Sequence, residues 1–209
     1  MKVVSVVSRK GGSGKSTVAT ALAGTFATGG VPSAIVDLDP QGSASAWGSS
    51  RPADRASVEV VVAKPANLGE VLGGLRARGV AMTIVDTPPH NDAAVAGALA
   101  FADVVLMPAL PSAFDLHALA SQLEGVVQSR KPALAILNSV TPNTVGLREA
   151  QAAVAAMGLQ LLAVCRRMAW QYAAARGLSP TELEPRGEAA NETRAICEAV
   201  IKMLDGEGR

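Results

Sequence analysis

Short runs of β-branched and other apolar residues alternate along the chain with longer segments rich in alanine and leucine. Runs of five or six residues are typical of buried strands, and the longer segments have the composition of helices. The expected strands are residues 3–8, 33–37, 82–86, 104–108, 133–138 and 159–164. The expected helices are residues 15–29, 67–78, 93–101, 116–129, 145–157 and 191–204.

This alternation predicts an α/β fold, in which right-handed crossovers join a mostly parallel sheet with helices on both faces. Residues 48–66 are expected to form a longer irregular connection. No internal repeat or linker divides the sequence, so we expect residues 1–209 to form one domain. Ligands of such sheets bind at the carboxyl ends of the strands, and chemistry is therefore expected directly after each strand.

The composition predicts a large aliphatic core. Of the 209 residues, 49% are hydrophobic, 18% are charged and only 3% are aromatic, which excludes intrinsic disorder. The net charge of +1 indicates no partner, so any binding driven by charge has to be local. Cys165 and Cys197 are too few for a disulfide framework or a metal site, which favours a reducing cytoplasm.

Neither a signal peptide nor a membrane-spanning helix is expected. The N-terminus runs directly into a glycine-rich loop, without the charged, apolar and cleavage regions of a signal peptide. The longest apolar stretch, residues 93–107, is interrupted by Asp103 and is shorter than the ~20 residues that a membrane helix needs. We therefore expect a soluble, cytoplasmic protein without a membrane partner.

A glycine-rich turn follows the first expected strand and leads into a helix. Backbone N–H groups of such a turn converge on phosphate oxygens, and the helix N-terminus adds its dipole. Lys15 is expected to reach the β- and γ-phosphates, and Ser16 to offer its hydroxyl to Mg²⁺. The predicted phosphate site comprises Gly11, Gly12, Ser13, Gly14, Lys15, Ser16 and Thr17, and it is preceded by Lys10.

Acidic residues close the second and third expected strands. Asp37 and Asp39 are spaced i, i+2 and therefore share a face of the strand, which we expect to point towards the phosphate turn. One of them is expected to hold hydrated Mg²⁺ while the other orients the water that attacks the γ-phosphate. Asp86 ends an apolar run in the manner of a Walker-B aspartate, which supports Mg²⁺.

These motifs together resemble the ParA/MinD family of ATPases. The segment 10–16, Lys-Gly-Gly-Ser-Gly-Lys-Ser, matches the deviant Walker A motif, whose extra early lysine is the signature of that family. The segment 37–42, Asp-Leu-Asp-Pro-Gln-Gly, matches the second motif in its ParA form. The resemblance extends through residues 108–115, 137–138 and 172–178. Because no helix-turn-helix segment precedes the turn, the chain is similar to short, ParF-like ParA partition proteins.

The resemblance implies roles for individual residues of the two motifs. Lys10 would reach across a nucleotide-sandwich dimer to the partner's phosphates, whereas Lys15 would bind phosphate in its own subunit. Asp39 would position the hydrolytic water. Thr17 would touch the α-phosphate and Asn138 would recognise adenine. The Mg²⁺ site would comprise Asp37, Asp86 and Ser16.

The resemblance also implies a function, which is that of a weak ATPase acting as a positioning switch. ATP would dimerise the protein on nucleoid DNA, which it would bind without sequence preference. A ParB-like protein or a cargo adaptor would stimulate hydrolysis and release. The cargo would be a plasmid, a chromosome locus or a protein body such as a carboxysome.

A local excess of basic residues is the candidate DNA surface. Between Gly125 and Thr181 the chain has six basic residues and the single acid Glu149, although its overall charge is near zero. Contacts to phosphates need such a patch and no element that reads bases. The predicted DNA contacts are Arg148, Arg166, Arg167 and Arg176, and the other basic residues of the segment are Arg130 and Lys131.

Two other functions stay open from the residues. One is a metabolic P-loop enzyme that activates a small carboxylate with ATP, although no substrate pocket stands out beyond the nucleotide motifs. The other is a MinD-like division-site regulator, which Gln41 and the acidic end of the chain disfavour. The last expected helix carries acids where a membrane-binding helix has lysine and arginine, so we expect it to pack in the core. These acids are Glu192, Glu198, Asp205 and Glu207.

Overall fold

A parallel sheet of seven strands organises the computed structural model, which describes residues 1–206. The strands lie in the order β3-β2-β4-β1-β5-β6-β7, and every neighbouring pair is parallel. Their bounds are β1 Lys2–Val6, β2 Ser33–Asp37, β3 Val58–Val62, β4 Met82–Asp86, β5 Val104–Ala109, β6 Ala133–Val140 and β7 Gln160–Cys165. The predicted α/β fold with a parallel sheet is confirmed.

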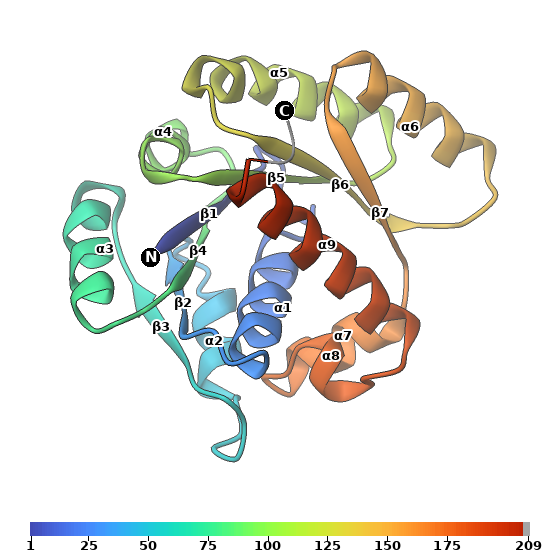
Figure 1. The fold of residues 1–209 in the computed structure, drawn as a ribbon. Helices are drawn as coiled ribbons and strands as arrows, with labels where there is room; N and C mark the ends of the chain where they lie inside the picture. Colours follow the sequence, from blue (N-terminus) through green and yellow to red (C-terminus); the bar gives the residue numbers. More distant parts are fainter. Residues whose placement is uncertain (207–209) are drawn as a thin grey trace.

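Helices cover both faces of the sheet (Figure 1). One layer consists of α1 Lys15–Thr28, α2 Ser43–Ser49, α7 Met168–Ala175, α8 Pro180–Leu183 and α9 Glu188–Leu204. The other layer consists of α3 Leu68–Ala77, which a short 3₁₀ turn at Pro65–Asn67 precedes, α4 Asp92–Phe101, α5 Ala113–Ser129 and α6 Val145–Ala156. Each layer encloses its own apolar core against the sheet.

Successive side chains of each strand belong alternately to these two cores. On β1, Val4 and Val6 belong to the core under α1 and α9, whereas Val3 belongs to the core under α4 and α5. On β2, Ile35 and Val36 separate in the same way. Successive side chains of a strand point to opposite faces, so a strand between two helical layers buries side chains on both faces and is mostly apolar.

The connection expected at residues 48–66 is the main correction to the sequence prediction. It contains β3, which pairs in parallel with β2, and the end of α2. The strand was not predicted because it lies at the edge of the sheet. Its sequence includes Glu59, and only its first residue, Val58, is buried. The helix α2 contains three serines and a glycine among its seven residues, and these residue types have lower helix propensity than alanine or leucine. Helices α7 and α8 also lie outside the helices that were expected.

The register of the central strands brings the candidate chemistry together. Asp37 at the end of β2 lies opposite Asp86 at the end of β4. Asp86 in turn lies opposite Val6 of β1, directly before the glycine-rich turn. All three segments therefore leave the sheet at the same edge.

The final helix α9 packs in the core, as expected. Ile196, Val200 and Met203 are buried against the layer of α1. Cys197 is buried among them, and burial raises the pKa of its thiol to about 12. Within residues 1–206 no helix is both long and apolar enough to span a membrane. Glu207, one of the acids that the sequence interpretation used, lies outside the described residues.

Two glycines in helices are expected to respond oppositely to alanine. A Cβ at Gly48 of α2 would lie 2.6 Å from Cγ2 of Val60, whereas a Cβ at Gly73 of α3 would have no atom within 4 Å. Removing a helical glycine gains about 1 kcal/mol, but overpacking costs about 1–3 kcal/mol. Gly73→Ala should therefore raise the free energy of unfolding in urea by up to about 1 kcal/mol, and Gly48→Ala should lower it. A stabilised Gly48→Ala variant would show that α2 does not rest on β3.

Candidate nucleotide-binding site

The glycine-rich turn is shaped by backbone conformations that favour glycine. Gly12 has φ 76° and Gly14 has φ 96°, and Gly14 is the N-cap of α1. A Cβ at Gly14 would lie 1.9 Å from Nδ2 of Asn138. That nitrogen donates to the Ser13 carbonyl at 3.0 Å, so Asn138 supports the turn from the end of β6. The role of Asn138 in adenine recognition stays a prediction.

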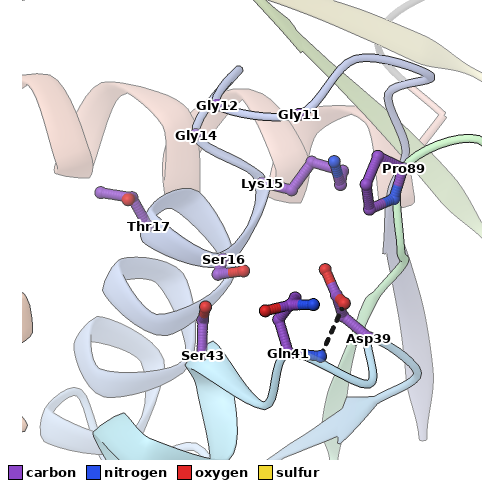
Figure 2. A pocket seen from close by; sticks show the side chains of 10 residues that line it. All are labelled: Gly11, Gly12, Gly14, Lys15, Ser16, Thr17, Asp39, Gln41, Ser43 and Pro89. Carbon is purple, nitrogen blue, oxygen red and sulfur yellow. Dashed lines mark hydrogen bonds between the residues drawn. The ribbon is translucent and has the colours of Figure 1, made fainter.

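A cavity of about 390 Å³ opens at the start of α1. Lys15 and Ser16 lie on one side of it and face Asp39 and Gln41 across the space, with Thr17 near the rim (Figure 2). The lining comprises Gly11, Gly12, Gly14, Lys15, Ser16, Thr17, Asp39, Gln41, Ser43 and Pro89. Residues predicted from the two motifs therefore meet in one cavity, and Ser43 and Pro89 are lining residues that the prediction lacked.

Asp37 is fully buried, and both of its carboxylate oxygens accept hydrogen bonds. Oδ1 accepts from the backbone N–H of Asp39 at 3.1 Å. Oδ2 accepts from the N–H and the hydroxyl of Ser45 at 2.9 and 2.7 Å. Asp37 thus fastens the first turn of α2 to the end of β2, and this leaves its predicted role at Mg²⁺ as a prediction.

Asp86 is buried in a different way. Neither carboxylate oxygen has a hydrogen-bond partner among residues 1–206. Burial raises the pKa of the Asp86 carboxyl to about 7 and outweighs the lowering by Ser16 and Lys15, while the charges of Asp37 and Asp39 add smaller upward contributions. A buried carboxylate without a donor, next to the Ser16 hydroxyl, fits a hydrated magnesium ion.

The donor set also fits magnesium in number. Among residues 1–206 no group of three or more His, Cys, Asp or Glu side chains could hold a metal ion by itself. Mg²⁺ characteristically takes one or two carboxylates and completes its octahedron with water and substrate phosphates. A single carboxylate such as Asp86, beside the Ser16 hydroxyl, is a donor set of this kind.

The two lysines of the turn lie in different places. Lys15 lines the cavity, and burial lowers the pKa of its ammonium group while Asp86 and Asp39 oppose that shift. Lys10 does not line the cavity, and its Nζ instead lies 2.6 Å from Oδ2 of Asp115. Nζ also lies 6.0 Å from the ring centre of Phe114, whose side chain is 82% exposed.

Asp115 is a site residue that the sequence interpretation missed. Its side chain is 1% exposed, and Ser112 also donates a hydrogen bond to the oxygen that Lys10 contacts. The residue stood inside the family-like segment 108–115, but nothing in that segment linked it to Lys10, which is 105 positions away. Only the fold brings the start of α5 to the glycine-rich turn.

The four predicted DNA contacts differ in their surroundings. Arg148 in the first turn of α6, Arg166 after β7 and Arg176 after α7 are exposed. Arg167 is half-buried, and its Nε donates to Glu192 at 3.1 Å. That hydrogen bond raises the pKa of Arg167 and leaves its charge largely neutralised, although contact with DNA stays a prediction for all four residues.

The fold and the site define a P-loop nucleotide-binding protein. Residues 4–180 match the family described as the CobQ/CobB/MinD/ParA nucleotide binding domain, and the chain belongs to this family. The chain is 33% identical to "Maintenance of carboxysome distribution protein A" of Halothiobacillus neapolitanus, over 95% of each chain. It is 34% identical to the protein of the same description from Gloeobacter kilaueensis, over 100% of this chain and 96% of that one.

Solved structures confirm the fold. The MinD cell division protein of Aquifex aeolicus superposes with a TM-score of 0.80 at 15% identity, covering 96% of this chain and 97% of that chain. Apo McdA from Cyanothece superposes with a TM-score of 0.76 at 18% identity, covering 96% and 99%. The match to the family model and to the two relatives confirms the predicted resemblance to the ParA/MinD family.

The raised pKa of Asp86 predicts a pH dependence of stability in nucleotide-free protein. An unfolded aspartate ionises near pH 4, whereas folded Asp86 keeps its proton up to about pH 7. Unfolding therefore releases a proton in this window, and Asp86 makes the folded state less stable as pH rises from about 4 to about 7. Asp86→Asn should remove this loss, up to about 4 kcal/mol at pH 8. The measurement is urea unfolding in EDTA at several pH values, and a variant no more stable than wild type at pH 8 would contradict it.

Proposed function

We propose that the chain is an ATP-dependent positioning ATPase, which binds DNA as an ATP-bound dimer and releases it after hydrolysis. Support comes from two relatives named for carboxysome distribution, which match nearly the whole chain at 33% and 34% identity. A relative described as "Protein ParA" matches 63% of the chain at 31% identity. The proposed cargo is a large body, such as a carboxysome or a plasmid, and a partner on the cargo stimulates hydrolysis.

The placement of Lys10 is the observation that carries the proposal. Its ammonium group points away from its own nucleotide cavity and towards Asp115 and the exposed ring of Phe114. The Lys10 side chain is 38% exposed, whereas its partner Asp115 is buried, so Lys10 can leave the pair from the solvent side and contact another anion. Phosphates of a nucleotide held by a second copy are that anion in our proposal.

Within one subunit the chemistry of hydrolysis is divided among four side chains. Lys15 and the backbone N–H groups of the turn bind the phosphates, since they line the cavity. Ser16 and Asp86 hold Mg²⁺, which when bound neutralises the charge that develops on the phosphates. Asp39 orients the attacking water, because its carboxylate faces Lys15 across the cavity and is fixed by the Gln41 N–H at 2.9 Å. ADP and phosphate are the products.

DNA binding is proposed for one exposed arginine that follows β7 and for another that follows α7. Arg166 and Arg176 are exposed, and Arg176 stacks on Tyr172 at 5.8 Å. A dimer presents two such surfaces, and linked sites gain affinity through effective concentration without new contacts. Because the dimer forms with ATP, ATP controls the affinity for DNA. We propose on this basis that the protein is cytoplasmic and associates with the nucleoid.

Dimerisation is tested with Lys10→Ala. The variant should bind a fluorescent ATP analogue with wild-type affinity, because Lys15 and the turn remain, but it should stay monomeric with ATP in light scattering. Asp39→Ala is the matched variant, which should dimerise with ATP while its turnover falls about 100-fold, as expected when water is no longer oriented. A Lys10→Ala protein that dimerises normally would refute the role across the subunit boundary.

DNA binding is tested by fluorescence anisotropy with a duplex of random sequence. Wild-type protein should bind with ATP and much less with ADP, and the logarithm of affinity should fall with slope of about −0.9 per phosphate contact against log salt. Replacing Arg166 and Arg176 together by Glu should abolish binding and preserve the ATP dimer. Arg76→Glu on α3, which is equally exposed, is the control and should bind normally. Equal wild-type binding with both nucleotides would instead favour a metabolic ATP-using enzyme.

A further inference from the structure

A buried arginine follows α2, the helix that comes after Asp39 in the chain. Arg51 comes two residues after α2, and its side chain is only 6% exposed. It pairs with Glu182 of α8, whose side chain is 2% exposed, at 2.7 Å. By contrast, the ion pair between Arg78 and Glu59 lies at the surface, where the two side chains are 53% and 41% exposed.

All five N–H donors of the Arg51 guanidinium are used, and they join three segments of the chain. Nε and Nη2 donate to the Ala56 carbonyl before β3 at 2.9 and 2.8 Å. Nη1 donates to the Gly177 carbonyl at 2.8 Å, in the turn between α7 and α8. Nη1 and Nη2 also donate to the two oxygens of Glu182 at 3.1 and 2.7 Å. A lysine ammonium group cannot reproduce this planar fork.

The backbone at Arg51 lies very close to the backbone at Gly177. A Cβ at Gly177 would lie 2.4 Å from the backbone nitrogen of Arg51, so only glycine lets the two segments meet. Trp47 of α2 stacks under the guanidinium at 5.0 Å, and its indole N–H donates to the Leu178 carbonyl at 3.0 Å. The end of α2 and the turn between α7 and α8 are therefore joined by close backbone contact and by hydrogen bonds.

Glu182 also lies next to α1, the helix that follows the glycine-rich turn. A Cβ at Gly24 of α1 would lie 3.1 Å from Oε2 of Glu182. Although burial alone would raise the pKa of Glu182, hydrogen bonds from Arg51 and Ser179 lower it, so the carboxylate stays charged. Glu182 and Arg51 thus fix α1, α2 and α8 relative to one another.

Towards the nucleotide these elements separate. A crevice of about 330 Å³ runs between α1, α2 and α7, and it shares Ser16, Thr17 and Ser43 with the nucleotide cavity. Ala174 and Ala175 of α7 form its other wall. The helices are therefore fastened at the Arg51 end and open at the end where phosphates bind.

We propose that Arg51 is a positioning residue of the ATPase, which holds α2 and the α7–α8 turn as one unit so that the Asp39 segment and the Arg176 surface respond together to the nucleotide. Arg51 contacts neither the nucleotide cavity nor the DNA surface. It acts through α2, whose Ser45 is bonded to Asp37, and through Gly177, which adjoins Arg176. The proposal rests on the proposed function for ATP hydrolysis and for DNA binding, whereas the hydrogen-exchange test described next depends on neither.

The first test is hydrogen exchange and needs neither hydrolysis nor DNA. Adding ATP and Mg²⁺ to the wild-type chain should slow exchange in residues 172–183, as well as in the glycine-rich turn. In Arg51→Lys the glycine-rich turn should still become protected from exchange when ATP is added, but residues 172–183 should not. The proposal is overturned if residues 172–183 of the wild type ignore ATP, or if they respond equally in the variant.

The second test separates positioning from a merely structural role. Arg51→Lys and Glu182→Gln should keep the affinity for a fluorescent ATP analogue within about twofold, while kcat falls about tenfold, the equivalent of a weakened transition-state contact. Arg78→Lys is the matched control at a surface ion pair, and it should change neither quantity. All assays run well below the unfolding midpoint of each variant, so wild-type kcat in a folded Arg51→Lys protein would refute the proposal. Wild-type protein that fails to bind DNA with ATP would refute the proposed function and leave these comparisons valid.

Discussion

The parallel register of β2, β4 and β1 is the constraint on which the site depends. It sets Asp37 opposite Asp86, and Asp86 opposite Val6, so that three chain segments leave the sheet side by side. A shift of one residue in either pairing would turn these side chains to the other face of the sheet. Both faces are packed with aliphatic residues, and a slipped strand would therefore also disturb two cores. The geometry of the candidate site and the folding stability thus depend on the same pairing.

Two similar carboxylates at this edge have opposite surroundings. Asp37 receives three hydrogen bonds from its own neighbourhood, whereas the oxygens of Asp86 receive none within residues 1–206. A carboxylate that accepts several hydrogen bonds is stable as an anion without help, and one that accepts none needs a cation or a proton. Asp37 therefore holds the chain, whereas Asp86 is left to a proton or to the cation of our proposal. That division is invisible in the spacing of the residues.

The sequence predicted much of this architecture because its signals were local. Apolar runs such as 33–37 and 82–86 coincide with β2 and β4, and the motif residues Lys15, Ser16 and Asp39 line one cavity. The edge strand β3 was missed because Glu59 interrupts its valines and shortens the apolar run. The partners Asp115 of Lys10 and Glu182 of Arg51 were missed because they lie 105 and 131 positions away. Long-range pairs of charges leave no periodicity in a single sequence.

The indole of Trp47 has a practical consequence. The chain contains two tryptophans, and the other, Trp170 of α7, donates its N–H to Glu192. Trp47 is 3% exposed, lies in the wall of the crevice beside the nucleotide cavity, and is bonded to Leu178. Indole emission depends on the polarity and the hydrogen bonding around the ring. With Trp170 replaced by phenylalanine, the protein would carry a single tryptophan, at the contact between α2 and the α7–α8 turn, and changes at this contact could be followed by tryptophan fluorescence in real time without any attached dye.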